Sequence, residues 1–187
     1  MKKLLLVAAL FLAASCTHEN QKINLTLHLD DTKSNIGNGA KLDLMVFDDR
    51  ANDGIVGTKE FSSDEKVKII SQENVALLLT QKVEQNLIAK GFKKGNGKIV
   101  EIHIEQLHYL AKRGFPVGTS EGIAVIKILV KNTKTKSVVT KNFSLSLNNK
   151  HFIAPLESTD TSTINGLLQE ITRDILSNQD LLKTLAQ

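Results

Sequence analysis

Histidine and carboxylate side chains are the first candidates for chemistry in this sequence, because together they bind metals and move protons. The five histidines are scattered: His18, His28, His103, His108 and His151. His103 and His108 lie five residues apart on an expected strand, so they face opposite sides of a sheet unless a bulge intervenes. Glu101 and Glu105 share the face of His103, but their Cα atoms would lie about 13 Å apart, too far for a typical catalytic pair. The pattern favours a solvent-facing polar row and no metal site.

The segment that starts at Asp49 approaches a calcium-binding loop. Such a loop needs side-chain oxygens at positions 1, 3 and 5, glycine at 6 and glutamate at 12. Asp49, Asp53, Gly54 and Glu60 fit this spacing. Ala51 stands at position 3 and supplies no oxygen, and strand patterns flank the segment where helices are required. The sequence therefore predicts a glycine turn.

Motifs for catalysis or nucleotide binding are missing from the sequence. The chain has no G-x-S-x-G nucleophile elbow, no H-E-x-x-H motif and no P-loop. Its most glycine-dense stretch, residues 114–122, has no lysine for a phosphate cradle. We therefore expect no catalytic residues and no cofactor.

The same stretch holds an apolar loop formed by Phe115, Pro116 and Val117. Exposed apolar loop tips often mark partner contacts. We interpret these three residues as a candidate interaction tip. The alternative is that Phe115 tucks under its own sheet.

Cys16, the only cysteine, carries the most specific chemistry. Two lysines, an apolar run over residues 4–12 and small residues precede it, which is the layout of a signal peptide. The run is about half the ~20 residues that span a bilayer. Ala14 and Ser15 before the cysteine resemble the bacterial lipobox, which implies cleavage before Cys16 and its lipidation. The alternative is an ordinary secretory signal that leaves Cys16 as an incidental free thiol.

The residue after the cysteine bears on the choice of membrane. Thr17 stands there, where in enterobacterial-type sorting an Asp would retain the protein in the inner membrane. We therefore expect an anchor on the periplasmic face of the outer membrane. Residues 1–15 would be removed, residues 16–22 would form the lipidated tether, and residues 23–187 would fold.

The composition fits one soluble domain. The chain has 187 residues, of which 41% are apolar and 24% charged, close to ordinary soluble domains. The formal charge of +4 includes Lys2 and Lys3 of the signal, and no long basic block remains. With no Trp and one Tyr, few platforms exist for stacking on bases. Nucleic acid is therefore not an expected partner.

Hydrophobic periodicity predicts the elements that carry these residues. Alternation or continuous apolar runs predict strands at residues 23–29, 42–47, 55–61, 99–110, 122–130 and 138–147, the third as an edge strand. Helical spacing predicts a helix capped by Ser71 that runs to residue 90, a second helix over residues 161–176, and a short last helix capped by Ser177. The expected fold is α+β: a two-layer sandwich with two helices on one face of a mostly antiparallel sheet of about 4–6 strands.

The order of these segments resembles the YajG family of bacterial lipoproteins. The residues that carry the resemblance are the lipobox, Val46-Phe47-Asp48-Asp49-Arg50, Val56-Gly57-Thr58-Lys59 and a helix that ends before Gly91-Phe92, followed by a β-meander and a C-terminal helix. Lys59 stands where the family pattern has Arg. The resemblance implies an outer-membrane lipoprotein with no assigned activity and brings no catalytic residues.

Three functions remain open on the sequence alone. The first is a non-enzymatic, lipid-anchored module that binds another envelope protein or supports envelope assembly. The second is a binder of a small envelope ligand, such as a lipid, glycan or peptidoglycan fragment, in a cleft between helices and sheet. The third is a hydrolase with a non-standard site, which requires ionisable groups that converge in one concavity.

Overall fold

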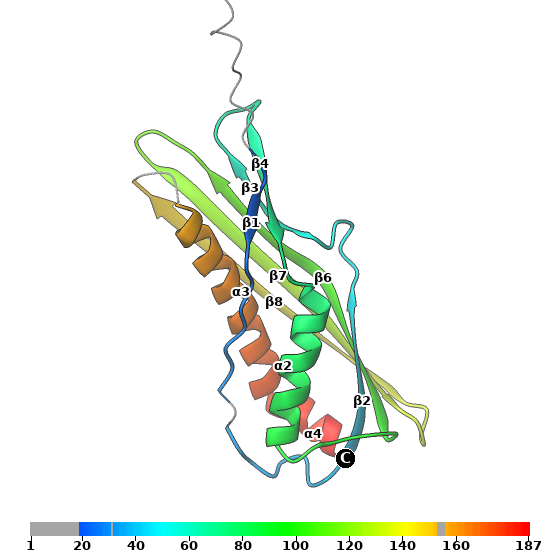
Figure 1. The fold of residues 1–187 in the computed structure, drawn as a ribbon. Helices are drawn as coiled ribbons and strands as arrows, with labels where there is room; N and C mark the ends of the chain where they lie inside the picture. Colours follow the sequence, from blue (N-terminus) through cyan, green and yellow to red (C-terminus); the bar gives the residue numbers. More distant parts are fainter. Residues whose placement is uncertain (1–18, 31, 153–155) are drawn as a thin grey trace, which may run out of the picture.

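The computed structural model describes residues 19–30, 32–152 and 156–187. A long, curled sheet forms one layer, and helices cover its concave face (Figure 1). The elements in chain order are β1 (Gln21–Ile23), β2 (Lys41–Asp48), β3 (Ile55–Glu60), β4 (Lys66–Ser71), α2 (Val75–Ala89), β5 (Lys93–Lys94), β6 (Lys98–Lys112), β7 (Gly118–Asn132), β8 (Val138–His151), α3 (Glu157–Ser177) and α4 (Gln179–Ala186). None of the described helices is long and apolar enough to cross a membrane.

The fold is α+β as predicted, but the sheet is mixed and curled, so the prediction of a mostly antiparallel two-layer sandwich of about 4–6 strands is wrong. In the described residues it has eight strands, with three helices beside it. Strands β6, β7 and β8 form the predicted antiparallel meander. On its other side β6 pairs in parallel with both β2 and β3, which follow each other along its length. The chain reaches β6 only after crossing through α2, and such a crossover allows parallel pairing.

Strand β4 was missed by the sequence interpretation, and its presence changes the place of β3. Val67 and Ile69 of β4 point into the core, and β4 pairs antiparallel with β3. Strand β3 therefore lies between β4 and β6 and is not the edge strand that we predicted.

The first apolar segment is correctly predicted in burial but not in pairing. Leu25 and Leu27 are buried, and Thr26 between them is exposed, as alternation predicts. Strand β1 ends at Ile23, so of the predicted strand over residues 23–29 only the first residue joins the sheet. The backbone N–H of Leu25 donates to Glu73 and that of Thr26 donates to Asn165. Side chains near α2 and on α3 thus replace a neighbouring strand as hydrogen-bond partners.

Helix α2 ends as predicted but begins later. Its N-cap is Asn74 and not Ser71, because the Asn74 side chain accepts a hydrogen bond from the N–H of Leu77 at 2.8 Å. At the other end Gly91 has a φ of +89°, and the N–H of Phe92 donates to the carbonyl of Leu87. These are the features of a Schellman cap.

The C-terminal helices also differ from the prediction at their starts. Helix α3 begins at Glu157, four residues before the predicted start, and α4 is capped by the side chain of Asn178 and not by Ser177. The early start of α3 places Asp160 in its first turn.

A β-bulge in β6 decides which residues of this central strand face the core. The pairing of β6 with β7 shifts between Ile104 and Gln106. Before the bulge the even-numbered residues Val100, Ile102 and Ile104 are buried, and after it the odd-numbered Leu107, Tyr109 and Ala111 are buried. From the alternation of Val100, Ile102 and Ile104, the sequence predicts Leu110 on the same buried face; this prediction is wrong, because one extra residue inverts the alternation and Leu110 is only half-buried.

The space between helices and sheet is filled. The buried side chains of the sheet's concave face and of α2, α3 and α4 form one continuous apolar cluster. The helix–sheet cleft that the small-ligand hypothesis requires is therefore occupied by the protein's own core.

Candidate functional site

The predicted interaction tip lies in the loop between β6 and β7. Phe115 is fully exposed, so it does not tuck under its own sheet, and Val117 is partly exposed. Gly118, the first residue of β7, pairs with His151, the last residue of β8. This pairing brings the exposed Phe152 beside the loop. Leu156, at the start of α3, is also exposed. We call the exposed residues at this end of the molecule the apolar tip: Phe115, Pro116, Val117, Phe152 and Leu156.

A buried polar network lies behind the apolar tip. Asp160 of α3 is completely buried, and its carboxylate accepts hydrogen bonds from Lys59 Nζ of β3 at 2.6 Å and from the Tyr109 hydroxyl of β6 at 2.9 Å. The Tyr109 hydroxyl also interacts with the Ser120 side chain of β7. The network joins α3 to three strands, so it fixes the start of α3 against the sheet.

Sequence reasoning missed this network. The sequence showed Lys59 only as a Lys in place of the family's Arg, and uninterrupted alternation along β6 would place Tyr109 on the outer face. One signal for this network was available in the sequence. A basic residue, Lys59, stands between two apolar residues, Val56 and Val67, which are buried, and a basic side chain that is itself buried needs a partner of opposite charge. The identity of that partner, 101 residues further along the chain, is a property of the tertiary structure.

Ser120 and His151 make a second contact in the same region. The Ser120 hydroxyl lies 2.8 Å from Nε2 of His151, a distance typical of a nucleophile and its base. Ser120 is only 1% exposed, and it is not among the lining residues of the groove described below. A substrate carbonyl would have no route to this hydroxyl, so we interpret the pair as part of the structural network.

The buried network predicts the titration of Tyr109. Burial raises the pKa of the Tyr109 phenol above its ordinary value of about 10, and the neighbouring Asp160 carboxylate raises it further. The native state therefore keeps a proton that the unfolded state releases, so the stability present below about pH 10 is lost as the pH rises above it. Tyr109 is the chain's single tyrosine, and its tyrosinate absorbance can be followed alone. We expect tyrosinate to form only together with loss of circular dichroism; tyrosinate that forms near pH 10 in folded protein would contradict this.

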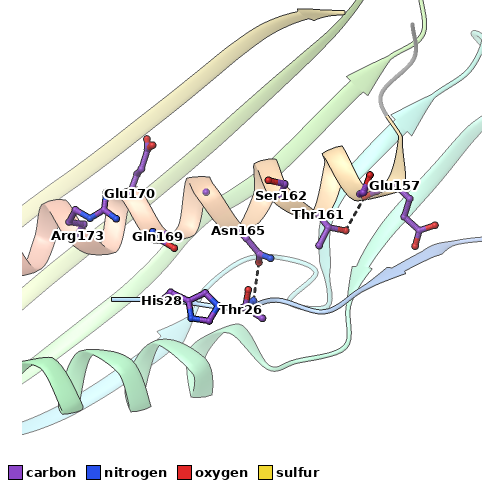
Figure 2. Close-up of a pocket in the computed structure, with 11 residues that line it drawn as sticks. Thr26, His28, Glu157, Thr161, Ser162, Asn165, Gln169, Glu170 and Arg173 are labelled. Carbon is purple, nitrogen blue, oxygen red and sulfur yellow. Dashed lines mark hydrogen bonds between the residues drawn. The ribbon is translucent and has the colours of Figure 1, made fainter. Parts of the chain in front are cut away.

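A long groove runs along the outer side of α3 (Figure 2). It has a volume of about 800 Å³ and is lined by α3 and by the extended segment that follows β1. Figure 2 shows the Asn165 side chain of α3 reaching the backbone of Thr26 across it. Its lining side chains are almost all polar: Thr26, His28, Glu157, Ser158, Thr161, Ser162, Asn165, Gly166, Gln169, Glu170 and Arg173.

Gly166 forms an open position in the middle of this groove. A Cβ atom built on Gly166 would meet nothing within 4 Å. Glycine inside a helix costs roughly 0.5–1 kcal/mol relative to alanine. The packing of α3 therefore does not require this glycine, and it leaves the groove wider at its centre.

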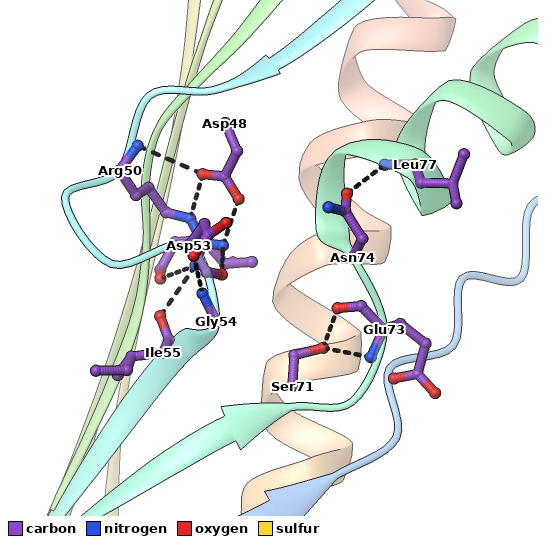
Figure 3. Close-up of polar contacts among 10 residues, drawn as sticks. Asp48, Arg50, Asp53, Gly54, Ile55, Ser71, Glu73, Asn74 and Leu77 are labelled. Atoms are coloured by element: carbon purple, nitrogen blue, oxygen red, sulfur yellow. Dashed lines mark hydrogen bonds and ion pairs between the residues drawn. The ribbon is translucent and has the colours of Figure 1, made fainter.

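The turn that resembled a calcium loop is organised by Arg50 (Figure 3). The Arg50 guanidinium donates to the Asp48 carboxylate at 2.6 and 2.7 Å, and also to the backbone carbonyls of Asp53, Ile55 and Leu107. The protein's own cation thus occupies the middle of the turn. The Asp-x-Arg motif closes the loop between β2 and β3, so that both strands can pair with β6.

The histidines of β6 lie on the convex face. Because of the bulge, His103 and His108 face the same side of the sheet, not opposite sides as predicted. His103 contacts Asp49 at 2.7 Å and stacks on Phe47, while Glu101 pairs with Lys131 at 2.5 Å. The hydrogen bond from Lys131 lowers the pKa of the Glu101 carboxyl. Within the described residues, no three His, Cys, Asp or Glu side chains gather as metal ligands do.

Cys16, the predicted lipidation site, lies outside the described residues, as do residues 1–15 of the expected signal. The described chain starts at Glu19, and β1 follows at Gln21. The structure therefore gives the place where the expected tether enters the fold.

Comparisons with known proteins agree with a lipoprotein. The model of a family described as uncharacterized lipoprotein matches residues 28–186. A crystal structure of a protein from Xanthomonas campestris is similar, with a TM-score of 0.61, 9% identity and coverage of 88% of this chain and 96% of that chain. A second crystal structure, of an uncharacterized protein, has a TM-score of 0.51, 12% identity and coverage of 84% and 97%. At these identities the likeness shows the fold alone. No curated protein matches the chain.

Proposed function

We propose that this chain, which belongs to the family of uncharacterised lipoproteins, is a non-enzymatic binding module of the bacterial envelope, anchored through lipid on Cys16. The signal-like segment and the small residues before Cys16 support the anchor. Thr17 after the cysteine, and the resemblance to the YajG family, support the periplasmic face of the outer membrane. A role in binding, and not in catalysis, is supported by the burial of the Ser120 hydroxyl. Among the described residues, this hydroxyl most closely resembles an activated nucleophile, because it contacts a histidine.

The groove along α3 is the observation that carries the binding role. From Glu157 to Arg173 its lining spans sixteen residue steps of helix, or about 24 Å. That length matches about seven residues of extended chain at ~3.4 Å each. A groove so long, lined by polar side chains, suits an extended segment of a partner protein, held by hydrogen bonds to side chains such as Ser162, Asn165 and Gln169.

Site-specific photo-crosslinking in cells tests this proposal. A photoreactive amino acid at Ser162, which is exposed within the groove, is expected to give a discrete protein adduct. The same amino acid at Leu77, exposed on α2 outside the groove lining, is the matched control. The variant Gly166→Gln fills the open centre of the groove and is expected to abolish the Ser162 adduct while leaving the fold intact.

The outcomes separate the two binding hypotheses. An adduct that persists in Gly166→Gln would contradict the groove as the binding site. No protein adduct, together with binding of a purified peptidoglycan fragment that Gly166→Gln weakens, would favour the small envelope ligand instead. Metabolic labelling with a fatty-acid analogue tests the anchor separately, since Cys16→Ser is expected to remove the label.

A further inference from the structure

We propose that the apolar tip docks into the surface of the membrane that carries the lipid anchor, so that the domain stands on the bilayer at a second point. The inference goes beyond the proposed function in assigning a lipid bilayer as the occupant of the tip, and it rests on that function only for the anchor at Cys16. Three features carry it: the exposed apolar side chains, the place where the tether enters the fold, and the charges around the tip.

The apolar tip exposes large side chains that the fold itself does not use. Phe115 is 101% exposed, Phe152 is 89% exposed and Leu156 is 69% exposed. They come from two neighbouring connections, the β6–β7 loop and the link from β8 to α3. Clusters of exposed apolar residues are unusual on soluble surfaces and mark contacts with proteins or membranes. Aromatic side chains are also favoured at the level of lipid headgroups.

The tether enters the fold at the same end of the molecule. Strand β1 runs parallel to β4 with Gln21 opposite Ile69, and the Asn20 side chain accepts a hydrogen bond from the N–H of Lys68. Continuing this register places Glu19 beside Val67 of β4. Across the sheet, through β3, Val67 is aligned with Ala111 of β6, which is one residue before the end of that strand. Figure 1 shows the start of β1 and the β6–β7 loop at one end of the ribbon, opposite α4.

The distance from the fold to the anchor is short. Cys16 precedes Glu19 by three residues, which span at most about 11 Å when fully extended. A lipid on Cys16 therefore holds this end of the domain close to the bilayer. Residues at the far end, such as Ile88 near the end of α2, are kept away from it. The occupant nearest to the apolar tip is then the membrane itself.

Basic side chains that can contact phosphate headgroups lie directly beside the apolar tip. Lys112 and Arg113 stand at the start of the β6–β7 loop, and Lys150 lies one residue before the end of β8. The same end also carries acidic side chains: Glu60, which is paired with Lys66 and lies 3.9 Å from Lys112, Glu157 at the start of α3, Glu19 before β1, and Asp64 and Glu65 between β3 and β4. Long basic side chains can keep their charge among headgroups while neighbouring apolar side chains enter the bilayer.

The chain's composition allows a direct test of insertion. It has one cysteine, Cys16, so a chain that starts at Cys16 can be coupled at that thiol alone to vesicles containing maleimide lipid. It has no tryptophan, so Phe115→Trp supplies a single fluorescent probe at the apolar tip. The vesicles are made of phosphatidylethanolamine and phosphatidylglycerol, with or without bromine on the acyl chains. Ile88→Trp, a half-exposed position at the far end, is the matched control.

Bromine quenches tryptophan only on close approach, so it reports entry into the bilayer. We expect the Phe115→Trp emission to shift to the blue on coupling and to be quenched several-fold more than that of Ile88→Trp. Adding Phe152→Ser to Phe115→Trp is expected to reduce this quenching. Equal quenching of the two probes would overturn the proposal. Since the anchor is supplied chemically here, failure of Cys16 lipidation in cells would overturn the proposed function without changing this result.

Discussion

Replacing Asp160 by alanine is expected to lower the free energy of unfolding by about 3–5 kcal/mol. The change removes a carboxylate that is 0% exposed and leaves the Lys59 ammonium, itself 8% exposed, without its partner. It also removes the acceptor of the Tyr109 hydroxyl. Burying a charge without a partner is among the largest penalties that a single substitution causes. Urea unfolding followed by circular dichroism, on the chain without its lipid, measures the difference.

Two further variants separate the charge effect from general damage to α3. Asp174→Ala removes an exposed carboxylate from the same helix and is expected to change stability by no more than about 0.5 kcal/mol. The double variant Lys59→Met/Asp160→Leu removes both charges and is expected to recover much of the loss, because apolar residues often replace a buried ion pair with little cost. A loss of less than about 1 kcal/mol in Asp160→Ala would contradict a desolvated ion pair.

The second large effect is expected in α2. Leu79→Ala should lower the free energy of unfolding by about 2–5 kcal/mol, because Leu79 is 1% exposed and its removal leaves a cavity between the helix and the sheet. Leu77 lies two residues earlier on the same helix and is 56% exposed. Leu77→Ala is therefore expected to change the same quantity by less than about 0.5 kcal/mol.

The comparison of these two leucines tests which face of α2 packs on the sheet. Both variants change leucine to alanine within α2, so helix propensity contributes equally to each. Equal losses would show that α2 is packed differently from the arrangement described. The midpoint of urea unfolding, with the slope of the transition as a check on two-state behaviour, gives the comparison.

Local patterns predicted much of the secondary structure. Strict alternation predicted the burial of Leu25 and Leu27, and continuous apolar character predicted the strand β7, although this strand is buried on one face only and Ile123 on its other face is exposed. Gly91 followed by Phe92 predicted how α2 ends, because a left-handed glycine followed by an apolar residue is typical of that cap. These features depend on neighbours within a few residues, which the sequence displays directly.

The direction and order of the strands could not be predicted in the same way. Strand β6 accepts β2 and β3 as parallel partners, and nothing in the alternation of any one of these strands indicates which strand it will pair with. Arg50 makes this arrangement possible because it closes the loop between β2 and β3 and donates a hydrogen bond to the backbone carbonyl of Leu107. Before the fold was known, the same motif indicated only a turn.

By itself the sequence determined the segments that bury apolar side chains, the apolar loop around Phe115 and the lipobox-like residues before Cys16. Tertiary structure alone decided that Phe152 and Leu156 join that loop in one surface, and that Tyr109 faces inward to meet Asp160. The physical reason is that one extra residue in β6 inverts the alternation at the bulge. Contacts between residues as distant as Lys59 and Asp160 form only when the sheet and α3 have packed together.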